Sequence, residues 1–199
     1  MSLRDPEPLT RRRLLDAAED LMSSKGFVAT SVEEICGKAG VTKGSFFHYF
    51  DCKQALGETV LKRFAEHQTS RLGDACGDIE DPLDRVFALI DCMTDVFNEP
   101  TMRGCLIGTF AQEVSSTHPV LRSACEEQFG RFSSAVARDL SAAKERYAPT
   151  SEVDPTSLGG LFVALVQGSF LVFKVNGDRG QMLANLKHFR GYLEKLFAR

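Results

Sequence analysis

The sequence predicts an all-α fold of about nine helices. Apolar residues recur every three to four positions along most of the 199-residue chain, as in helices that bury one face. We find neither a strong alternation of apolar and polar residues, which would indicate strands, nor an internal repeat. Serine, threonine and aspartate precede many of the periodic segments and glycines follow several of them, as helix caps do.

The N-terminal part of the chain predicts a loose arm and then two helices. Residues 1–8 are polar and contain two prolines. A first helix is expected over residues 9–24, with Gly26 as its left-handed cap. A second helix is expected over residues 32–39, where a preceding threonine or serine can cap it and a glutamate occupies the return position of a capping box.

A tight turn, AGVTKG, leads to a third helix over residues 43–49, capped by Thr42. Two short helices joined by a glycine-containing turn, with another helix packed in front, form a helix-turn-helix. We therefore predict a three-helix domain of this type over residues 9–50. In such a unit the second short helix lies in the major groove of DNA.

The rest of the chain predicts longer helices. A fourth helix over residues 51–67 connects the first domain to a helical body over residues 68–199. Each later helix shows an apolar stripe or a clear start signal, such as proline in its first turn. These helices are expected over residues 82–99, 103–116, 117–147, 155–175 and 179–197.

Charge is compatible with a DNA-binding head. The net charge of −3 argues against nucleic acid when the chain is taken as a whole. Residues 1–63, however, hold ten basic and nine acidic side chains, whereas residues 64–199 hold 14 and 18. A slightly basic head is thus joined to an acidic body.

The six cysteines form no metal motif. None belongs to a CxxC pair or has zinc-ligand spacing, so we predict neither a metal nor a cofactor. The N-terminus lacks a basic-then-apolar export signal, which favours a cytoplasmic protein without disulfides. We expect most of the cysteines to be small buried hydrophobes.

The segment over residues 155–175 is the most apolar part of the chain. A bilayer span needs about 18 apolar residues or more, but Gln167 and Lys174 interrupt this run. We therefore predict a buried helix and no membrane contact.

Three segments, AAEDLMSSKGFVATSVEEI, AGVTKGSFFHYF and KQAL, follow one another between Thr10 and Leu61. In this order and spacing they resemble the N-terminal domain of TetR-family transcriptional regulators. The resemblance implies a repressor whose head binds a near-palindromic double-stranded DNA operator. It also implies that the body, residues 68–199, binds a small effector and forms a homodimer.

The resemblance assigns DNA contacts to the helix-turn-helix. Helix N-termini offer free N–H groups and partial positive charge to phosphates. Lys43 and Ser45 are the best candidates for base edges, and Gly44 allows close approach. The aromatic and basic side chains that follow would reach phosphates. The predicted DNA-binding residues are Thr30, Ser31, Thr42, Lys43, Gly44, Ser45, Phe47, His48, Tyr49 and Lys53.

The aromatic cluster at residues 46–50 divides into two faces. Phe46 and Phe50 are four residues apart on the third helix and its end, so they share a face that we expect in the core. Phe47 points elsewhere. The family usually has a tyrosine at this position, which contacts the DNA backbone, and Phe47 lacks that hydroxyl. Its contact with DNA is left open.

A second segment, GCLIGTFAQEVSSTHPVLR, is similar to the branch of the family that responds to reactive electrophiles and small unsaturated acids. In that branch, a cysteine in the matching GC position and a lysine in the penultimate helix lie together in the sensing site. This implies that Cys105 is a reactive sensor thiol whose pKa Lys174 lowers. Arg103 and the start of a helix would also favour the thiolate.

Two alternatives to the sensor thiol remain. One is an inert buried cysteine with a lysine that extends to solvent. The other is reversible binding of a small acid or aldehyde, with Arg103 or Lys174 as the countercharge. For the aromatic candidates the alternative is ordinary core packing. The predicted effector residues are Cys105, Lys174, Arg103, Phe64, Met93, Phe97, Phe110 and Phe129.

The resemblance places the homodimer interface on the last two long helices. A helix that is apolar on nearly every face must be covered on all sides, and in a chain this small a partner subunit is the natural cover. A two-fold dimer on DNA would present its heads about 34–36 Å apart, or a multiple of this. The predicted interface residues are Leu158, Leu161, Phe162, Leu165, Phe189, Tyr192 and Leu193.

A thiol-dependent enzyme and a ligand carrier are the two other classes of function to consider. A thiol-dependent enzyme using Cys105 would need a base, but none of the four histidines adjoins a plausible nucleophile motif. A ligand carrier that has lost DNA binding is disfavoured by the intact VTKGSFFHYF segment and Lys53. The sequence therefore predicts a regulator and not an enzyme.

Overall fold

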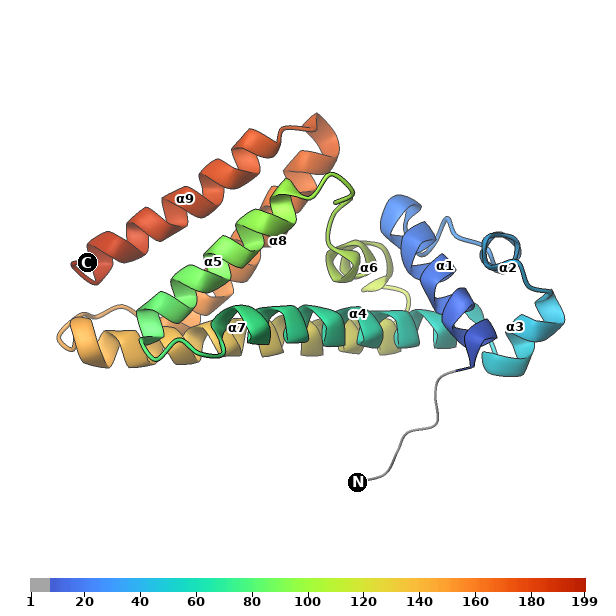
Figure 1. The fold of residues 1–199 in the computed structure, drawn as a ribbon, viewed down its shortest axis with the longest axis horizontal. Helices are drawn as coiled ribbons and strands as arrows, with labels where there is room; N and C mark the ends of the chain where they lie inside the picture. The colour runs from blue at the N-terminus through green and yellow to red at the C-terminus, as the bar shows by residue number, and fades with distance from the viewer. Residues whose placement is uncertain (1–7) are drawn as a thin grey trace, which may run out of the picture. The chain divides into compact units, whose positions relative to one another are not determined.

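The structure is a computed structural model that describes residues 8–199, so the arm predicted over residues 1–8 lies almost wholly outside the described residues. Within them the chain forms nine α-helices and no strand, which confirms the predicted fold class (Figure 1). The helices are α1 (Leu9–Lys25), α2 (Val32–Ala39), α3 (Lys43–Tyr49), α4 (Lys53–Cys76), α5 (Pro82–Asn98), α6 (Leu106–Val114), α7 (Pro119–Tyr147), α8 (Pro155–Asn176) and α9 (Arg179–Leu196).

The described chain divides into two compact units. The domain boundaries predicted from the sequence placed α6 with the body, whereas the structure places it with the N-terminal helices. The first unit comprises the chain up to Glu66 together with Cys105–Cys125, and the second comprises His67–Gly104 and Glu126–Arg199.

Helices α1, α2 and α3 form the three-helix bundle of the first unit (Figure 1). α1 buries Leu14, Ala18 and Met22, each 0% exposed and spaced four residues apart along one face. Phe46 of α3 is 0% exposed and Phe50 is 5% exposed, so both aromatic side chains belong to this core, as their spacing predicted.

Local caps start these helices where the sequence indicated. The Ser31 hydroxyl accepts the N–H of Glu34 at 3.2 Å, and the Glu34 carboxylate accepts the N–H of Ser31 at 2.9 Å, which completes a capping box on α2. α2 ends at Gly40, whose φ of 65° is the left-handed conformation that suits glycine. Thr42 then caps α3 by accepting the N–H of Ser45 at 3.1 Å.

The start of α4 and the whole of α6 complete the core of the first unit. Phe110 of α6 is 0% exposed, and its ring lies 5.1 Å from that of Phe27, between α1 and α2. Gly57 of α4 lies against both rings, because a Cβ built there would be 3.0 Å from Phe27 and 3.3 Å from Phe110. The missing side chain thus lets α4 approach this aromatic pair.

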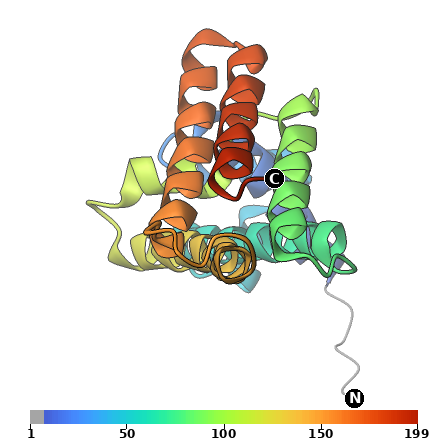
Figure 2. The same cartoon turned by 90° about the vertical axis from the view of Figure 1, so that its left-hand side faces the viewer.

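In the second unit, α9 packs beside both α8 and α5 (Figure 2). The rings of Phe162 on α8 and Phe189 on α9 stack with centroids 5.1 Å apart. Arg179 closes the end of α5, since its guanidinium donates to the carbonyl oxygens of Phe97 at 2.5 Å and Glu99 at 2.8 Å. It thereby satisfies carbonyl groups that a helix end leaves without a partner within the helix.

Gly159 allows a close approach of α8 to α7. A Cβ built on Gly159 would lie 2.5 Å from the carbonyl oxygen of Ser133 and 3.1 Å from the Cβ of Ala137. Real Cβ atoms do not approach a backbone oxygen so closely, so a side chain here must push the two helices apart. Built Cβ atoms on Gly160 and Gly168, by contrast, meet nothing within 4 Å in this chain.

Gly159→Ala is therefore expected to destabilise the protein by about 1–3 kcal/mol, the usual cost of forcing an extra group into a packed site. Urea denaturation followed by circular dichroism measures the change. Gly130→Ala in α7 is the matched control, because a Cβ there meets nothing within 4 Å. Equal stability of Gly159→Ala and the parent would show that the two helices separate without cost.

Candidate nucleic-acid interface and effector site

The outer face of α3 is polar and accessible. Thr42, Lys43, Gly44 and His48 are exposed and Ser45 is half-buried, whereas the core residue of the same helix is fully covered. The hydroxyl of Thr42 is engaged in the cap, at 3.0 Å from the Ser45 hydroxyl. The N–H groups of Lys43 and Gly44, in the first turn, have no acceptor within the helix. This face thus combines hydroxyl groups, a lysine and helix N–H groups, which are ligands for phosphate and base edges.

Lys43 forms an ion pair with Glu33 of α2. The side chains are 56% and 61% exposed. The hydrogen bond from Lys43 is the main reason that the pKa of Glu33 is below its ordinary value. Exposed ion pairs are weak and are screened by salt. Lys43 can therefore exchange this partner for a base or a phosphate, and its role as a DNA contact stays a prediction.

Gly44 and Phe47 are both open to the outside. A Cβ built on Gly44 would have only the Thr42 hydroxyl nearby, at 3.7 Å, so the packing of this chain does not require glycine there. The Phe47 side chain is 55% exposed, and its ring lies edge-on to Phe46 at 5.1 Å. The structure thus shows that Phe47 leaves the core, while its contact with DNA remains a prediction.

His48 and Tyr49 lie together at the end of α3. Their rings meet edge-on with centroids 4.7 Å apart. His48 is exposed and Tyr49 is half-buried. Their predicted phosphate contacts stay predictions.

At the N-terminus of α2, the two predicted DNA contacts, Thr30 and Ser31, differ in how accessible their side chains are. Ser31 is half-buried and caps the helix. The prediction for Thr30 is wrong for its side chain, because Thr30 is only 1% exposed and its hydroxyl donates to the carbonyl oxygen of Gly26 at 2.6 Å. A buried hydroxyl that already donates to a carbonyl cannot reach a phosphate.

Lys53 also departs from the prediction, because its ammonium turns inward. It donates to the carbonyl oxygens of Phe27 at 2.9 Å and Thr30 at 2.8 Å, and it lies 4.4 Å from the centre of the Phe27 ring. Burial lowers the pKa of Lys53, and the negative charge of Glu113 partly offsets this effect. In this conformation Lys53 faces protein carbonyls and not the surface that would meet a phosphate.

Cys105 stands at the N-cap of α6, directly after Gly104, whose φ is 131°. The helix begins at Leu106, slightly later than predicted, and the thiol is half-buried. Cys125 lies in the same unit. Burial raises the pKa of the Cys125 thiol to about 11, and the electrostatic effect of the nearby Cys105 is the second cause. Cys105 is thus the more accessible thiol of the two.

The predicted countercharges are exposed. Both Arg103 and Lys174 are open to solvent. Within the second unit, a Cβ built on Gly104 would lie 3.0 Å from Cε of Lys174, so the lysine stem passes directly over this glycine. The pairing of Lys174 with Cys105 stays a prediction.

The effector candidates with large apolar side chains are divided between the two units. Phe97 and Phe110 are each 0% exposed, and Phe110 belongs to the first unit. Phe97 packs edge-on against Phe170 with centroids 5.0 Å apart. Ordinary core packing, the alternative to effector binding, therefore explains why Phe97 and Phe110 are buried. Met93 is buried, and Phe64 and Phe129 are half-buried.

Four of the predicted dimer residues are core residues of their own chain. Leu158, Phe162, Phe189 and Leu193 are between 0% and 5% exposed, so they cannot face a partner, and their assignment was wrong. Leu158 and Phe162 belong to the helix predicted to be apolar on nearly every face, and Phe189 and Leu193 belong to the last helix, which the resemblance named as part of the interface. The remaining candidates lie outside: Leu161 is 49% and Tyr192 45% exposed, and Leu165 is half-buried.

The structure adds interface candidates that the sequence analysis missed. Leu171, Val172 and Val175 of α8 are 46–84% exposed. Leu161, Leu165, Gly168, Val172 and Val175 recur every three to four residues and form one stripe. The buried residues Leu158, Phe162, Val166 and Phe170 recur at the same spacing, so the sequence alone does not distinguish the two stripes. By length and composition alone α8 is long and apolar enough to cross a membrane, and one third of its most apolar stretch is buried in the protein. Core helices of soluble proteins can have the same length and composition.

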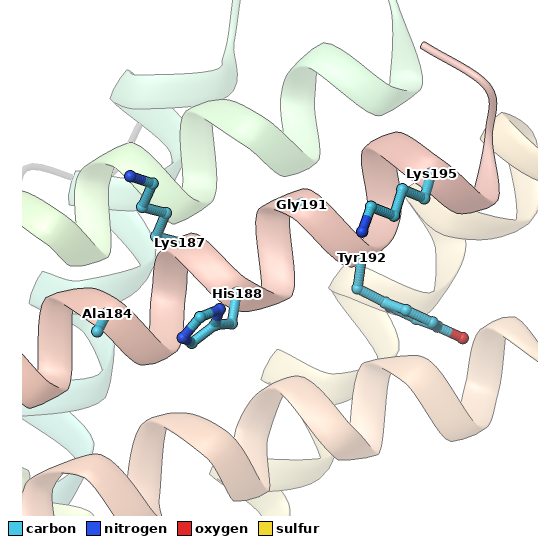
Figure 3. A pocket seen from close by; sticks show the side chains of 6 residues that line it. All are labelled: Ala184, Lys187, His188, Gly191, Tyr192 and Lys195. Carbon is cyan, nitrogen blue, oxygen red and sulfur yellow. The ribbon is translucent and has the colours of Figure 1, made fainter.

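Residues of α9 line a depression of about 620 Å³ (Figure 3). Small residues, Ala184 and Gly191, form part of its lining, and Lys187 and Lys195 stand at its sides. The rings of His188 and Tyr192 project from the same helix. None of the predicted effector residues lines this depression.

Of the six cysteines, half are buried. Cys36, Cys92 and Cys125 are covered, Cys76 and Cys105 are intermediate, and Cys52 is exposed at the turn between α3 and α4. The expectation that most are buried therefore holds for only three of them. The exposed thiol lies within the unit that carries α3.

Comparison with known proteins supports this arrangement along most of the chain. The family of bacterial regulatory proteins, tetR family, matches residues 14–60, and the tetracyclin repressor-like C-terminal domain matches residues 82–189. The repressor NemR of Escherichia coli K12 is 30% identical over 189 residues, covering 92% of this chain and 94% of NemR. The repressor DhaR of Mycobacterium sp. strain GP1 is 26% identical, covering 85% of this chain and 84% of DhaR.

Solved structures share the fold. The reduced form of E. coli NemR superposes with a TM-score of 0.80 at 26% identity, over 94% of this chain and 96% of that one. A TetR regulator from Chloroflexus aurantiacus superposes with a TM-score of 0.84 at 22% identity, over 92% of this chain and 93% of its own. The matches cover the helix-turn-helix and the helical body alike, and the chain belongs to the TetR family of bacterial transcriptional regulators.

Proposed function

We propose that the protein represses transcription by binding a near-palindromic operator as a homodimer, and that it leaves the operator when a small effector binds or when Cys105 is modified. The exposed polar face of α3, anchored from behind by the fully buried Phe46, carries the DNA-binding part of the proposal. The site of action is the cytoplasm, where the operator is.

The family to which the chain belongs argues against the alternative of a thiol-dependent enzyme. TetR-family regulators are DNA-binding proteins and not enzymes, and two relatives of this chain are named as repressors. Repression is therefore the sign of regulation that we propose. A carrier without DNA binding is disfavoured because α3 presents an exposed face with a lysine and hydroxyl groups, in a helix-turn-helix that matches the family model.

The dimer is proposed to form through the outer faces of α8 and α9. TetR-family regulators bind operators as homodimers. In this chain the stripe from Leu161 to Val175 leaves several large apolar side chains exposed, and burying them removes apolar surface from water. The depression on α9, with its small lining residues, gives a partner helix room to approach. Two heads related by this contact would read half-sites about 34–36 Å apart, or a multiple of this distance.

For the effector, we propose the half-buried thiol of Cys105 as the point of chemical response. It stands at the N-terminus of α6, where helix N–H groups favour a thiolate. Arg103, two residues before Cys105, is exposed, and Lys174 stays the predicted partner of the thiol. The rival proposal is reversible binding of a small acid or aldehyde, with either cation as countercharge.

Selection from a random duplex library tests operator binding directly. We expect a near-palindromic sequence to be enriched, and its affinity for the protein to fall as the salt concentration rises, because phosphate contacts release counterions. If no duplex sequence is enriched at low salt, the proposed function is wrong.

Gly44→Ala is expected to weaken operator binding by about ten-fold or more, because a methyl group on the face of α3 blocks close approach of DNA. The fold itself should tolerate the change, since only Thr42 lies near the added Cβ. Gly37→Ala in α2 is the matched control, because a Cβ there meets nothing within 4 Å. Fluorescence anisotropy on the selected operator measures both variants, and equal affinities would contradict the assignment.

Leu161→Asp is expected to convert the dimer to a monomer of 22.0 kDa, because it places an unpaired charge in the proposed contact. Size-exclusion chromatography with light scattering reads the mass. Val120→Asp, which changes a residue of α7 that is 51% exposed, should leave the dimer intact. A Leu161→Asp protein that remains dimeric would place the interface elsewhere.

N-ethylmaleimide is expected to weaken operator binding by about 5- to 150-fold, the usual range of coupling between two sites. The exposed Cys52 is close in sequence to the DNA-binding residues, so the test uses the Cys52→Ser protein. Adding Cys105→Ser to this variant should abolish the response. If the double variant still responds as the single variant does, Cys105 is not the sensor.

A further inference from the structure

The loop between α1 and α2, residues Gly26–Ser31, is held from two sides by side chains of opposite charge. Lys53, in the first turn of α4, donates to the carbonyl oxygens of Phe27 at 2.9 Å and Thr30 at 2.8 Å. Glu113, in the last turn of α6, accepts the N–H of Val28 at 3.0 Å. The same short loop thus supplies acceptors to a cation from one helix and a donor to an anion from another.

The loop is shaped to receive the Glu113 carboxylate. Gly26 has a φ of 91°, which favours glycine, and a Cβ built there would lie 1.8 Å from Oε1 of Glu113. The carboxylate therefore occupies the space that any other residue at position 26 would fill. The negative charge of Glu113 also favours the charged form of Lys53 and so raises the pKa of Lys53, against the larger effect of burial.

Aromatic packing fixes the loop between these two groups. The Phe27 ring is 2% exposed and lies 5.1 Å from Phe110 of α6 and 5.6 Å from His118. The Lys53 ammonium lies 4.4 Å from the centre of the same ring, within the range of a cation–π interaction. The loop, the start of α4 and α6 therefore form one packed cluster within the first unit.

The loop leads directly into the DNA-binding helices. Ser31, its last residue, caps α2, and α2 packs against α3. A change in the path of the loop therefore moves the start of α2 and, through it, the exposed face of α3. Hydrogen bonds to charged groups are stronger than those between neutral groups, so the clamp is suited to hold this path.

We propose that Glu113 and Lys53 are positioning residues for operator binding, which clamp the α1–α2 loop and touch no DNA themselves. The proposal rests on the operator binding proposed above and goes beyond it in two ways. It gives Lys53 a role inside the protein in place of the phosphate contact, and it makes α6 part of the DNA-binding apparatus. Movement of α6 away from the loop breaks the bond to Val28 and weakens operator binding.

The test compares Glu113→Ala and Lys53→Met with two controls that make no contact with the loop in this structure, Gln112→Ala and Lys62→Met. Gln112 donates to the carbonyl oxygen of Gly108 within α6, and Lys62 is exposed on α4. Operator affinity is measured for each full-length protein over a series of salt concentrations. The selected operator is the probe.

Glu113→Ala is expected to bind the operator about ten-fold more weakly, which corresponds to the loss of one hydrogen bond to a charged group. Lys53→Met, which loses two such bonds, should bind at least as weakly as Glu113→Ala. The dependence of log affinity on log salt concentration should keep the parent slope, because the variants neutralise the same phosphates as the parent. Both controls should bind as the parent does. Circular dichroism of each variant checks that it remains folded, and this separates positioning from a general loss of stability.

Two results would overturn the proposal. A shallower slope for Lys53→Met, by about 0.9 for each phosphate that the variant no longer neutralises, would show that Lys53 touches the DNA backbone. An unchanged affinity for Glu113→Ala would show that the clamp does not matter for binding.

Hydrogen exchange of the Val28 amide measures, in the absence of DNA, whether its hydrogen bond to Glu113 forms in solution. The amide should be protected in the parent and in Gln112→Ala, and should exchange faster in Glu113→Ala. If protection is equal in all three proteins, the clamp is absent in solution. If no operator is selected but the amide behaves as expected, the proposed function fails while the clamp itself stands.

Discussion

Burial of Phe46 is the constraint on which the DNA-binding face depends. Helix α3 has only seven residues, and isolated helices shorter than about 12–15 residues are marginal in water. Its existence therefore rests on packing. Phe46 at 0% exposure and Phe50 at 5% tie it to the core of the first unit, and burying such a side chain contributes about 1.5–3 kcal/mol. The same anchoring determines which side of α3 faces outward.

Helix α8 shows how one apolar helix can serve two purposes. One side packs Phe162 against Phe189, and the opposite side leaves Val175 84% exposed. Its hydropathy is almost uniform around the helix, so composition does not distinguish the two sides. Only the placement of α9 and α7 shows which residues are used within the chain. The dimer residues chosen from the sequence were therefore divided between core and surface.

Predictions that concerned short-range geometry were confirmed. The capping box of Ser31 and Glu34 and the cap of Thr42 connect residues three apart, so sequence spacing is sufficient to find them. The predictions for Thr30 and Lys53 failed because their partners are backbone carbonyls of a folded loop. For Lys53 these carbonyls lie 23 and 26 residues away. The bond from Val28 to Glu113 spans 85 residues, and no local pattern indicates it.

The sequence by itself determined the helical fold, the helix-turn-helix and the face of α3 that carries the polar residues, because each follows from periodicity and caps within a few residues. Tertiary structure decided that α6 packs with the N-terminal helices, that Lys53 turns inward and that only one stripe of α8 is open. These outcomes depend on which distant side chains share a packed core. Close packing admits one such set of neighbours, and sequence spacing does not identify it.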